Sequence, residues 1–128
     1  MGADAEGIFI SGSYFTNIDS PKNKEFLAAM QKKFGAGLKT PNDLSVPQYE
    51  GVYAYKLAVE KAGSTDPDKV IAALSQVSFE GPRGVIKMSK QRHAPLTMYL
   101  AQVQKDGSVK MLATFKDVDP GEQCPKLK

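Results

Sequence analysis

The spacing of apolar residues changes along the chain from that of a strand to that of helices, and then back again. Residues 7–15 are rich in β-branched and aromatic residues, which predicts a short strand that can be buried on both faces. Ser20 and Pro21 then predict the cap and first residue of a helix, and Gly35 predicts its end. The apolar stripe of this helix consists of Phe26, Leu27, Met30 and Phe34.

Two further helices are predicted in the middle of the chain. The first runs from about residue 48 to residue 62 and ends at Gly63. Its apolar residues cover much of its circumference, so we expect it to be sandwiched between layers. They are Tyr49, Val52, Tyr53, Tyr55, Leu57 and Val59. The next helix has Asp66 as its cap and Pro67 at its first position. Its expected buried stripe is Val70, Ile71, Leu74 and Val77.

Strand patterns return in the last third of the chain. Residues 79–84, Phe-Glu-Gly-Pro-Arg-Gly, predict a turn because proline fixes one dihedral angle and glycines permit positive φ. Residues 85–88 predict a short strand. Residues 98–104 and 108–115 predict a β-hairpin about Asp106-Gly107, a pair that suits a type I′ turn. The expected fold class is therefore α/β: one strand, three helices, a short strand and a hairpin.

The composition is that of an ordinary folded protein. The chain has 128 residues, of which 41% are hydrophobic and 24% charged, and its net charge is +3. Lysines are interspersed with acidic residues along the sequence, whereas nucleic-acid binding normally needs cations gathered on one face, so we expect no nucleic-acid partner. No apolar run approaches the roughly 20 residues of a membrane helix. The first six residues also lack the basic and apolar regions of a signal peptide.

Few residues have the spacing that catalysis requires. His93, the single histidine, lies in a polar segment without partners for metal binding or proton transfer. Cys124 has no second cysteine with which to form a disulfide inside the chain, and it lies near the end. Asp66 and Asp68 form a carboxylate pair, but their place at a helix start is better explained by capping. We therefore expect no enzyme, no catalytic residue, no cofactor and no metal site.

An ordered set of motifs spans most of the chain. Residues 19–26 read Asp-Ser-Pro-Lys-Asn-Lys-Glu-Phe, and residues 32–35 read Lys-Lys-Phe-Gly. Tyr49-Glu50 begins the second helix, and residues 79–88 read Phe-Glu-Gly-Pro-Arg-Gly-Val-Ile-Lys-Met. In this order and spacing, the motifs resemble the C-terminal part of the type I periplasmic solute-binding proteins of ABC transporters, the branched-chain amino acid, amide and urea family. The resemblance extends over residues 5–115.

The resemblance implies two α/β lobes joined by three crossovers, with a small solute held in the cleft between them. Lobe closure is a hinge motion that the membrane subunits of the transporter would read. The family protein is longer than this chain, so residues 1–116 are expected to be a partial fold that contributes to both lobes, and residues 117–128 a tail. Residues 20–88 would belong to the first lobe, and the strands in residues 7–14 and 98–115 to the second. The implied partners are an amino acid, amide, urea or aromatic acid and the membrane subunits, and the implied location is the periplasm.

Cleft contacts in this fold come from strand ends and hinge segments, which indicates where the solute would bind. The candidate ligand-binding residues are therefore Ser11, Ser13, Tyr14, Phe15 and, at its helix start, Tyr49. Their hydroxyls and rings suit an amide or carboxylate group, or stacking on an aromatic solute. An equal alternative is that Tyr14 and Phe15 only pack the hinge. Glu50 replaces the usual Asp of the family, and Ser89 stands near a common Asp, so the ligand class stays open.

The partial fold has a physical consequence. Helices that cover a parallel sheet need its apolar face, so an isolated chain without that sheet should expose apolar patches or bury them by self-association into a homo-oligomer. Two other interpretations remain. One is a stand-alone α+β protein-interaction module without small-molecule binding, which would be a folded monomer. The other is a small enzyme that uses Tyr and Glu side chains, which would need a deep pocket and a strongly shifted pKa.

Overall fold

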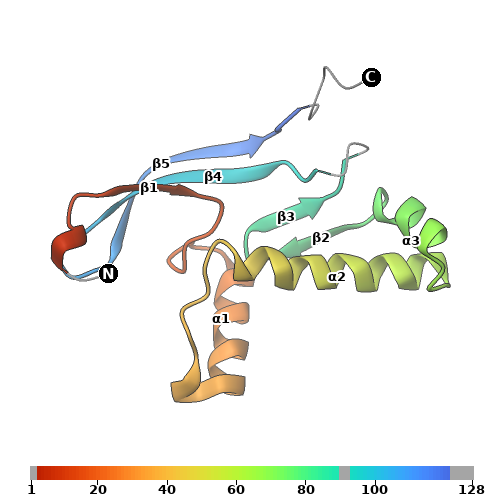
Figure 1. The fold of residues 1–128 in the computed structure, drawn as a ribbon, viewed down its shortest axis with the longest axis horizontal. Coiled ribbons are helices and arrows are strands. Elements are labelled where there is room, and N and C mark those ends of the chain that lie inside the picture. The colour runs from red at the N-terminus through yellow and green to blue at the C-terminus, as the bar shows by residue number, and fades with distance from the viewer. Residues whose placement is uncertain (1–2, 90–92, 122–128) are drawn as a thin grey trace.

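The computed structural model describes residues 3–89 and 93–121, and its elements form two parts (Figure 1). One part is a three-stranded antiparallel sheet in the order β1-β4-β5, and the other contains three helices and the β2-β3 hairpin. Two connections join the parts, one after β1 and one between β3 and β4. In chain order the helices and strands are β1 (Phe9–Gly12), α1 (Pro21–Phe34), α2 (Ser45–Ala62), α3 (Pro67–Leu74), β2 (Ser78–Gly81), β3 (Gly84–Lys87), β4 (Leu96–Val103) and β5 (Val109–Val118), with 3₁₀ turns at Ala3–Ala5 and Gly35–Gly37.

The sheet has β4 in its centre, with β1 and β5 antiparallel on either side. Ala101 of β4 is fully buried and lies opposite Ile10 of β1. By contrast, Phe9 of β1 is 63% exposed, so the expectation that this strand is buried on both faces is wrong for this chain. The physical reason is that β1 is an edge strand, and no described element covers its outer face.

Helix α1 begins and ends as its sequence predicts. The Ser20 side chain accepts a hydrogen bond from the Asn23 backbone N–H at 3.1 Å, and Pro21 is the first helical residue. Gly35 follows the helix with φ at 51°, a value that glycine adopts without a steric penalty. Phe26 is buried, whereas Phe34 at the end of the predicted stripe is 49% exposed.

Helix α2 begins earlier than predicted, at Ser45. The Asn42 side-chain oxygen accepts hydrogen bonds from the backbone N–H groups of Leu44 and Ser45, which turns the chain into the helix. The helix ends at Gly63, which has the expected left-handed conformation. The predicted sandwich is wrong within this chain, because Val52 remains 71% exposed.

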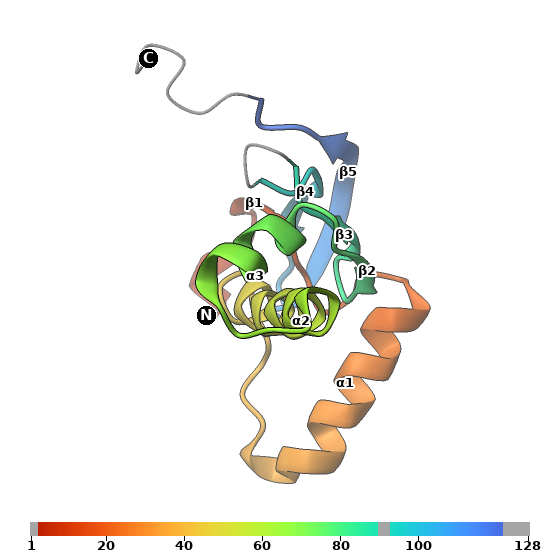
Figure 2. The same ribbon diagram turned by 90° about the vertical axis from the view of Figure 1, so that its right-hand side faces the viewer.

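The buried side of α2 meets α3 and β2 through small residues. Ala54 and Ala58 form one hydrophobic cluster with Val70, Ala73 and Val77. Figure 2, which looks along α2, shows α3 folded back beside it while α1 projects away from both. The cap of α3 is confirmed, since the Asp66 carboxylate accepts from the Lys69 N–H at 3.1 Å. The prediction that Ile71 is buried is wrong, because its side chain is 43% exposed.

The predicted turn at residues 79–84 is shorter than expected. Phe79 and Gly81 belong to β2, and Gly84 begins β3, so the turn itself consists of Pro82 and Arg83. The difference has a tertiary cause, because Phe79 pairs with Ile86 across the hairpin and packs against the α2–α3 cluster. Gly84 adopts φ of 104°, which accounts for the glycine at the end of this turn.

The β4-β5 hairpin is confirmed, but its turn is not type I′. A type I′ turn needs positive φ at both central residues, whereas Gly107 has positive φ and Asp106 does not. The Gly107 N–H donates to the Gln104 carbonyl, and the Gln104 N–H donates to the Ser108 carbonyl, each at 2.9 Å. These bonds match a type I turn followed by a left-handed glycine.

The expected tail begins later than predicted, because β5 continues through Val118. Asp117 within this strand has a positive φ of 52°. The rest of the expected tail includes Cys124, which lies outside the described residues. Within the part of the chain that the structure describes, no helix combines the length and the apolar character needed to cross a bilayer.

Candidate functional site

A chain of buried polar contacts joins the end of β1 to α2 and to the β2-β3 turn. The Arg83 guanidinium donates from Nε to Oε2 of Glu50 at 2.6 Å, and these side chains are 9% and 2% exposed. Arg83 also donates from Nη1 to the Ser13 hydroxyl at 2.8 Å. Ser13 in turn donates its hydroxyl and its backbone N–H to Oδ1 of Asp43, at 2.6 and 3.0 Å. We call these four residues the Arg83 network.

The local sequence explains how Glu50 reaches this position. Glu50 lies on the face of α2 that meets the β2-β3 hairpin, and there it also accepts from the Arg83 backbone N–H at 3.2 Å. Gly81 permits this close approach, because a Cβ atom there would lie 2.6 Å from Oε1 of Glu50. The ion pair therefore depends on a glycine beside it as well as on its two charges.

Tyr14 is held by a second polar cluster next to the Arg83 network. Its hydroxyl donates to Oδ1 of Asn23 at 2.9 Å, and the Asn23 amide donates to the carbonyls of Thr16 and Ile18. The Tyr14 side chain is 3% exposed and packs with Phe26 and other apolar residues. Burial, with a smaller contribution from the Glu50 charge, raises the pKa of Tyr14 to about 12. The phenol is therefore neutral and firmly placed.

The other predicted residues near the end of β1 lie in different surroundings. Phe15 is half-buried and stacks edge-to-face on Tyr99 of β4, with ring centroids 6.4 Å apart. Burial raises the pKa of Tyr99 above its usual value. Ser11 is exposed within β1. This arrangement gives the connection after β1 one aromatic pair with the sheet.

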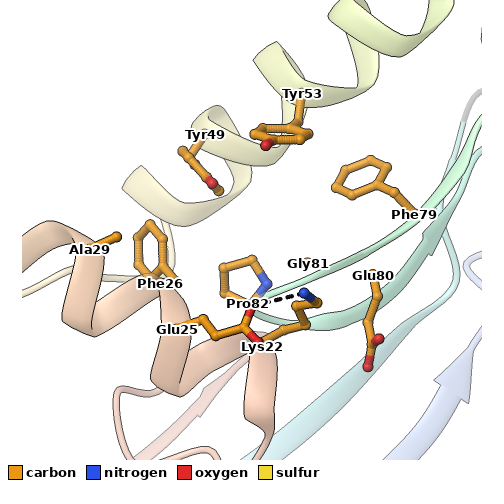
Figure 3. Close-up of a pocket in the computed structure, with 10 residues that line it drawn as sticks. All are labelled: Lys22, Glu25, Phe26, Ala29, Tyr49, Tyr53, Phe79, Glu80, Gly81 and Pro82. Atoms are coloured by element: carbon orange, nitrogen blue, oxygen red, sulfur yellow. Dashed lines mark hydrogen bonds and ion pairs between the residues drawn. The ribbon is translucent and has the colours of Figure 1, made fainter.

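A row of aromatic rings runs from α1 along α2 to β2 (Figure 3). Ring centroids are 5.0 Å apart for Phe26 and Tyr49, 5.5 Å for Tyr49 and Tyr53, and 5.9 Å for Tyr53 and Phe79. The row lines a cavity of about 320 Å³ whose rim carries the exposed Lys22–Glu25 ion pair. A second cavity, of about 360 Å³, lies between Phe26, Tyr49 and residues 37–42.

The two cavities described above do not bring the five predicted ligand-binding residues together. Tyr49 lines both cavities and is 42% exposed, so its ring is accessible. The hydroxyls of Ser13 and Tyr14 are instead engaged with Asp43 and Asn23. Sequence reasoning missed Asp43 and Arg83 altogether. The available signal was Glu50, a charged residue in the mostly apolar first half of α2, because such a residue needs a cationic partner when it is buried.

The buried polar side chains of the described residues are all paired. Every buried side-chain nitrogen or oxygen in the described segments has a hydrogen-bond partner. Residues 3–89 and 93–121 contain no group of three or more His, Cys, Asp or Glu side chains placed to bind a metal ion. What the site presents is a satisfied polar network and, on α2, the accessible rings of Tyr49 and Tyr53.

Comparison with known proteins supplies the context for this arrangement. A family model described as "Periplasmic binding protein" matches residues 1–108. The chain belongs to this family. The Leu/Ile/Val-binding protein homolog 6 of Brucella abortus (strain 2308) is 31% identical over 131 residues, which cover 94% of this chain and 33% of that protein. This confirms the resemblance that the sequence motifs indicated.

A solved structure extends the comparison to three dimensions. The solute-binding protein of an ABC transporter from Rhodopseudomonas palustris BisB5, in complex with 3,4-dihydroxybenzoic acid, is 34% identical with a TM-score of 0.81. The match covers 94% of this chain and 34% of that one. A Geobacillus stearothermophilus protein named limonene hydroxylase is 27% identical, over 80% of this chain and 19% of that protein. The chain thus spans about a third of the first relatives, and a partial α/β periplasmic-binding fold is confirmed.

Proposed function

We propose that the protein carrying this chain is the solute-binding component of an ABC transporter, which holds a small solute without chemistry and delivers it to the membrane subunits. The observation that carries the proposal is the family match over residues 1–108, together with the coverage of about a third of its relatives. Members of the family are periplasmic, and we place this protein in the same compartment.

The two parts of the chain suit the two lobes of such a protein. We assign the sheet β1-β4-β5 to the second lobe and the helices with β2-β3 to the first. Two connections join the parts, and the main contact between their elements is that of β3 with β4. This narrow contact is what a hinge requires, because an extensive apolar interface would oppose relative motion.

Among solutes, we favour an aromatic acid over an aliphatic amino acid. Three Rhodopseudomonas palustris relatives solved with 3,4-dihydroxybenzoic acid, p-hydroxybenzoic acid or 4-hydroxybenzoate are 34%, 35% and 36% identical over 90% or more of this chain. The relatives named for aliphatic amino acids are 31% identical over 94% of this chain and 40% identical over only 50% of it. The accessible ring of Tyr49 and the Phe15–Tyr99 pair offer faces on which an aromatic solute can stack. Ser11, Ser13 and Tyr14 remain candidate contacts near the hinge.

The test is solute binding by the full-length protein. Thermal shift and calorimetry with 3,4-dihydroxybenzoate and leucine should show stabilisation by the former, worth about 2.7 kcal/mol at a concentration 100 times Kd. Tyr49→Ala should weaken this binding, whereas Tyr55→Ala should not, because Tyr55 lies on the same helix but lines neither cavity. A response to leucine alone would overturn the ligand class, and no response to any solute of a broad panel would count against solute binding.

We also propose that the isolated 128-residue chain self-associates. Large apolar side chains are exposed on three separate elements, with Val52, Val85 and Phe9 at 71%, 65% and 63%, and we infer that the rest of the whole protein covers them. Light scattering on the isolated chain should therefore give a mass above that of a monomer. A compact monomer that binds no apolar dye would instead support the stand-alone interaction module.

A further inference from the structure

We propose that Arg83 is a positioning residue for the hinge: through Ser13 it fixes the direction in which the chain leaves β1, and thereby the relative orientation of the two lobes. The proposal rests on the assignment of the two parts to two lobes. Ser13 is the first residue after β1, so it stands where the connection between the parts begins. A contact at this point has the greatest influence on the path of the connection.

The geometry attaches Ser13 to the helical part at two points. Its hydroxyl accepts from Arg83 in the β2-β3 turn at 2.8 Å and donates to Asp43, just before α2, at 2.6 Å. Its backbone N–H also donates to Asp43, so the main chain itself is attached. Further along, Asn17 donates to the Val109 carbonyl at the start of β5. The connection is therefore held to the helices at its beginning and to the sheet further on.

The charges show why Arg83 acts through other residues rather than on the solute. Its Nε donates to Glu50 and its Nη1 to Ser13, and its side chain is 9% exposed. A carboxylate solute would have to displace Glu50, a buried anion held by the same guanidinium. The planar guanidinium of arginine can donate to Glu50 and Ser13 at the same time from different nitrogens, whereas a lysine has a single ammonium nitrogen and could reach only one of them.

The orientation of the lobes then depends on the network. When a connection has one preferred path, the open and closed arrangements are limited to those that keep its bonds. Loss of the Ser13 bonds would let the connection adopt additional paths, so the two parts would sample more orientations. A less organised cleft binds its solute more weakly, because binding must then order it.

The test measures the distance between the two parts in the full-length protein. Spin labels at Lys61→Cys, at the end of α2, and Lys105→Cys, in the β4-β5 turn, report the orientation by pulsed electron resonance. Both positions are exposed. Cys124 and any other cysteine are replaced by serine. This readout needs no solute, so it judges the proposal even where no solute is found.

Ser13→Ala, Asp43→Ala and Arg83→Met should each broaden or shift the distance distribution, and Asp43→Asn, which keeps an acceptor oxygen, should restore most of what Asp43→Ala loses. Each alanine variant should also weaken binding of 3,4-dihydroxybenzoate by about 5-fold or more. Lys56→Ala is the matched control, because it removes an exposed ion pair with Glu60 on the same helix and should change neither quantity.

Each outcome has a distinct meaning. Distance distributions of Ser13→Ala and Arg83→Met that coincide with that of the parent protein would overturn the proposal. If Ser13→Ala weakens solute binding but leaves the distances unchanged, Ser13 contacts the solute directly and the positioning role is wrong. If the parent protein binds no solute but the distances change as expected, the proposed function fails while the role of Arg83 stands.

Discussion

Replacing Arg83 with methionine should strongly destabilise the fold, because it leaves a buried carboxylate without its cation. Glu50 is 2% exposed at its side chain, and its Oε2 lies 2.6 Å from Nε of Arg83. Removal of one partner from a buried pair typically costs about 3–5 kcal/mol. The Arg83 backbone N–H still donates to Glu50 in the variant, so we expect the lower end, about 3 kcal/mol. Methionine retains a long side chain, which limits any loss from a cavity.

The assay is urea unfolding of the full-length protein, in which a lower midpoint at unchanged slope reports lost stability. The double variant Glu50→Gln/Arg83→Met should recover at least half of the loss, because a neutral amide is much less costly to bury than a carboxylate. Lys56→Met is the control, since its ion pair is exposed and should contribute less than about 1 kcal/mol. The reasoning is refuted if Arg83→Met costs no more than Lys56→Met, or if the double variant is no more stable than Arg83→Met.

Three further predictions concern the surroundings of this pair and the start of α1. Gly81→Ala should lower the free energy of unfolding by about 1–3 kcal/mol, because the new Cβ would lie 2.6 Å from a Glu50 oxygen; unchanged urea stability would show that Glu50 has room to move. Tyr14→Phe should lower the free energy of unfolding by about 1–3 kcal/mol, because the buried Oδ1 of Asn23 loses the hydroxyl that donates to it. Burial is the main reason that the pKa of Tyr14 rises from 10.0 to about 12 in the folded protein. The folded state therefore holds this proton more tightly than the unfolded state, which contributes stability that is complete below pH 10 and is lost as the pH rises towards 12. A pH series of unfolding should show a smaller loss in Tyr14→Phe than in the parent protein, because Tyr49 and Tyr99, whose pKa values are also raised by burial, remain in both; equal slopes would contradict the assignment. Ser20→Ala should cost about 1 kcal/mol by thermal or urea unfolding, because an N-cap is removed; a change below about 0.3 kcal/mol would mean that water replaces the cap.

Local features were predictable because the atoms that decide them lie close together in the chain. Ser20 and Asp66 each cap a helix by a bond to a residue three positions later. Gly63 ends α2 through its own left-handed backbone. The partial periplasmic-binding fold was also predictable, since its motifs keep a recognisable order and spacing.

Exposure was harder to predict, because it depends on what covers each face. Periodicity indicates that a side is apolar, but Val52, Ile71 and Phe9 are exposed in this chain even though each lies in an apolar pattern. The expected turn at residues 79–84 failed for a related reason. Phe79 is drawn into β2 by pairing with Ile86 and by packing against helices that are distant in the sequence.

By itself, the sequence determined the caps, the helix ends, the main strands and the family. Only the tertiary structure decided how Ser13, Asp43, Glu50 and Arg83 are used. The bonds that unite them span 30, 33 and 70 positions, and at such separations no local pattern indicates which polar groups will meet. Burial then requires that these groups pair, because a carboxylate removed from water needs a cation and hydrogen-bond donors, and the fold supplies them where the chain leaves β1.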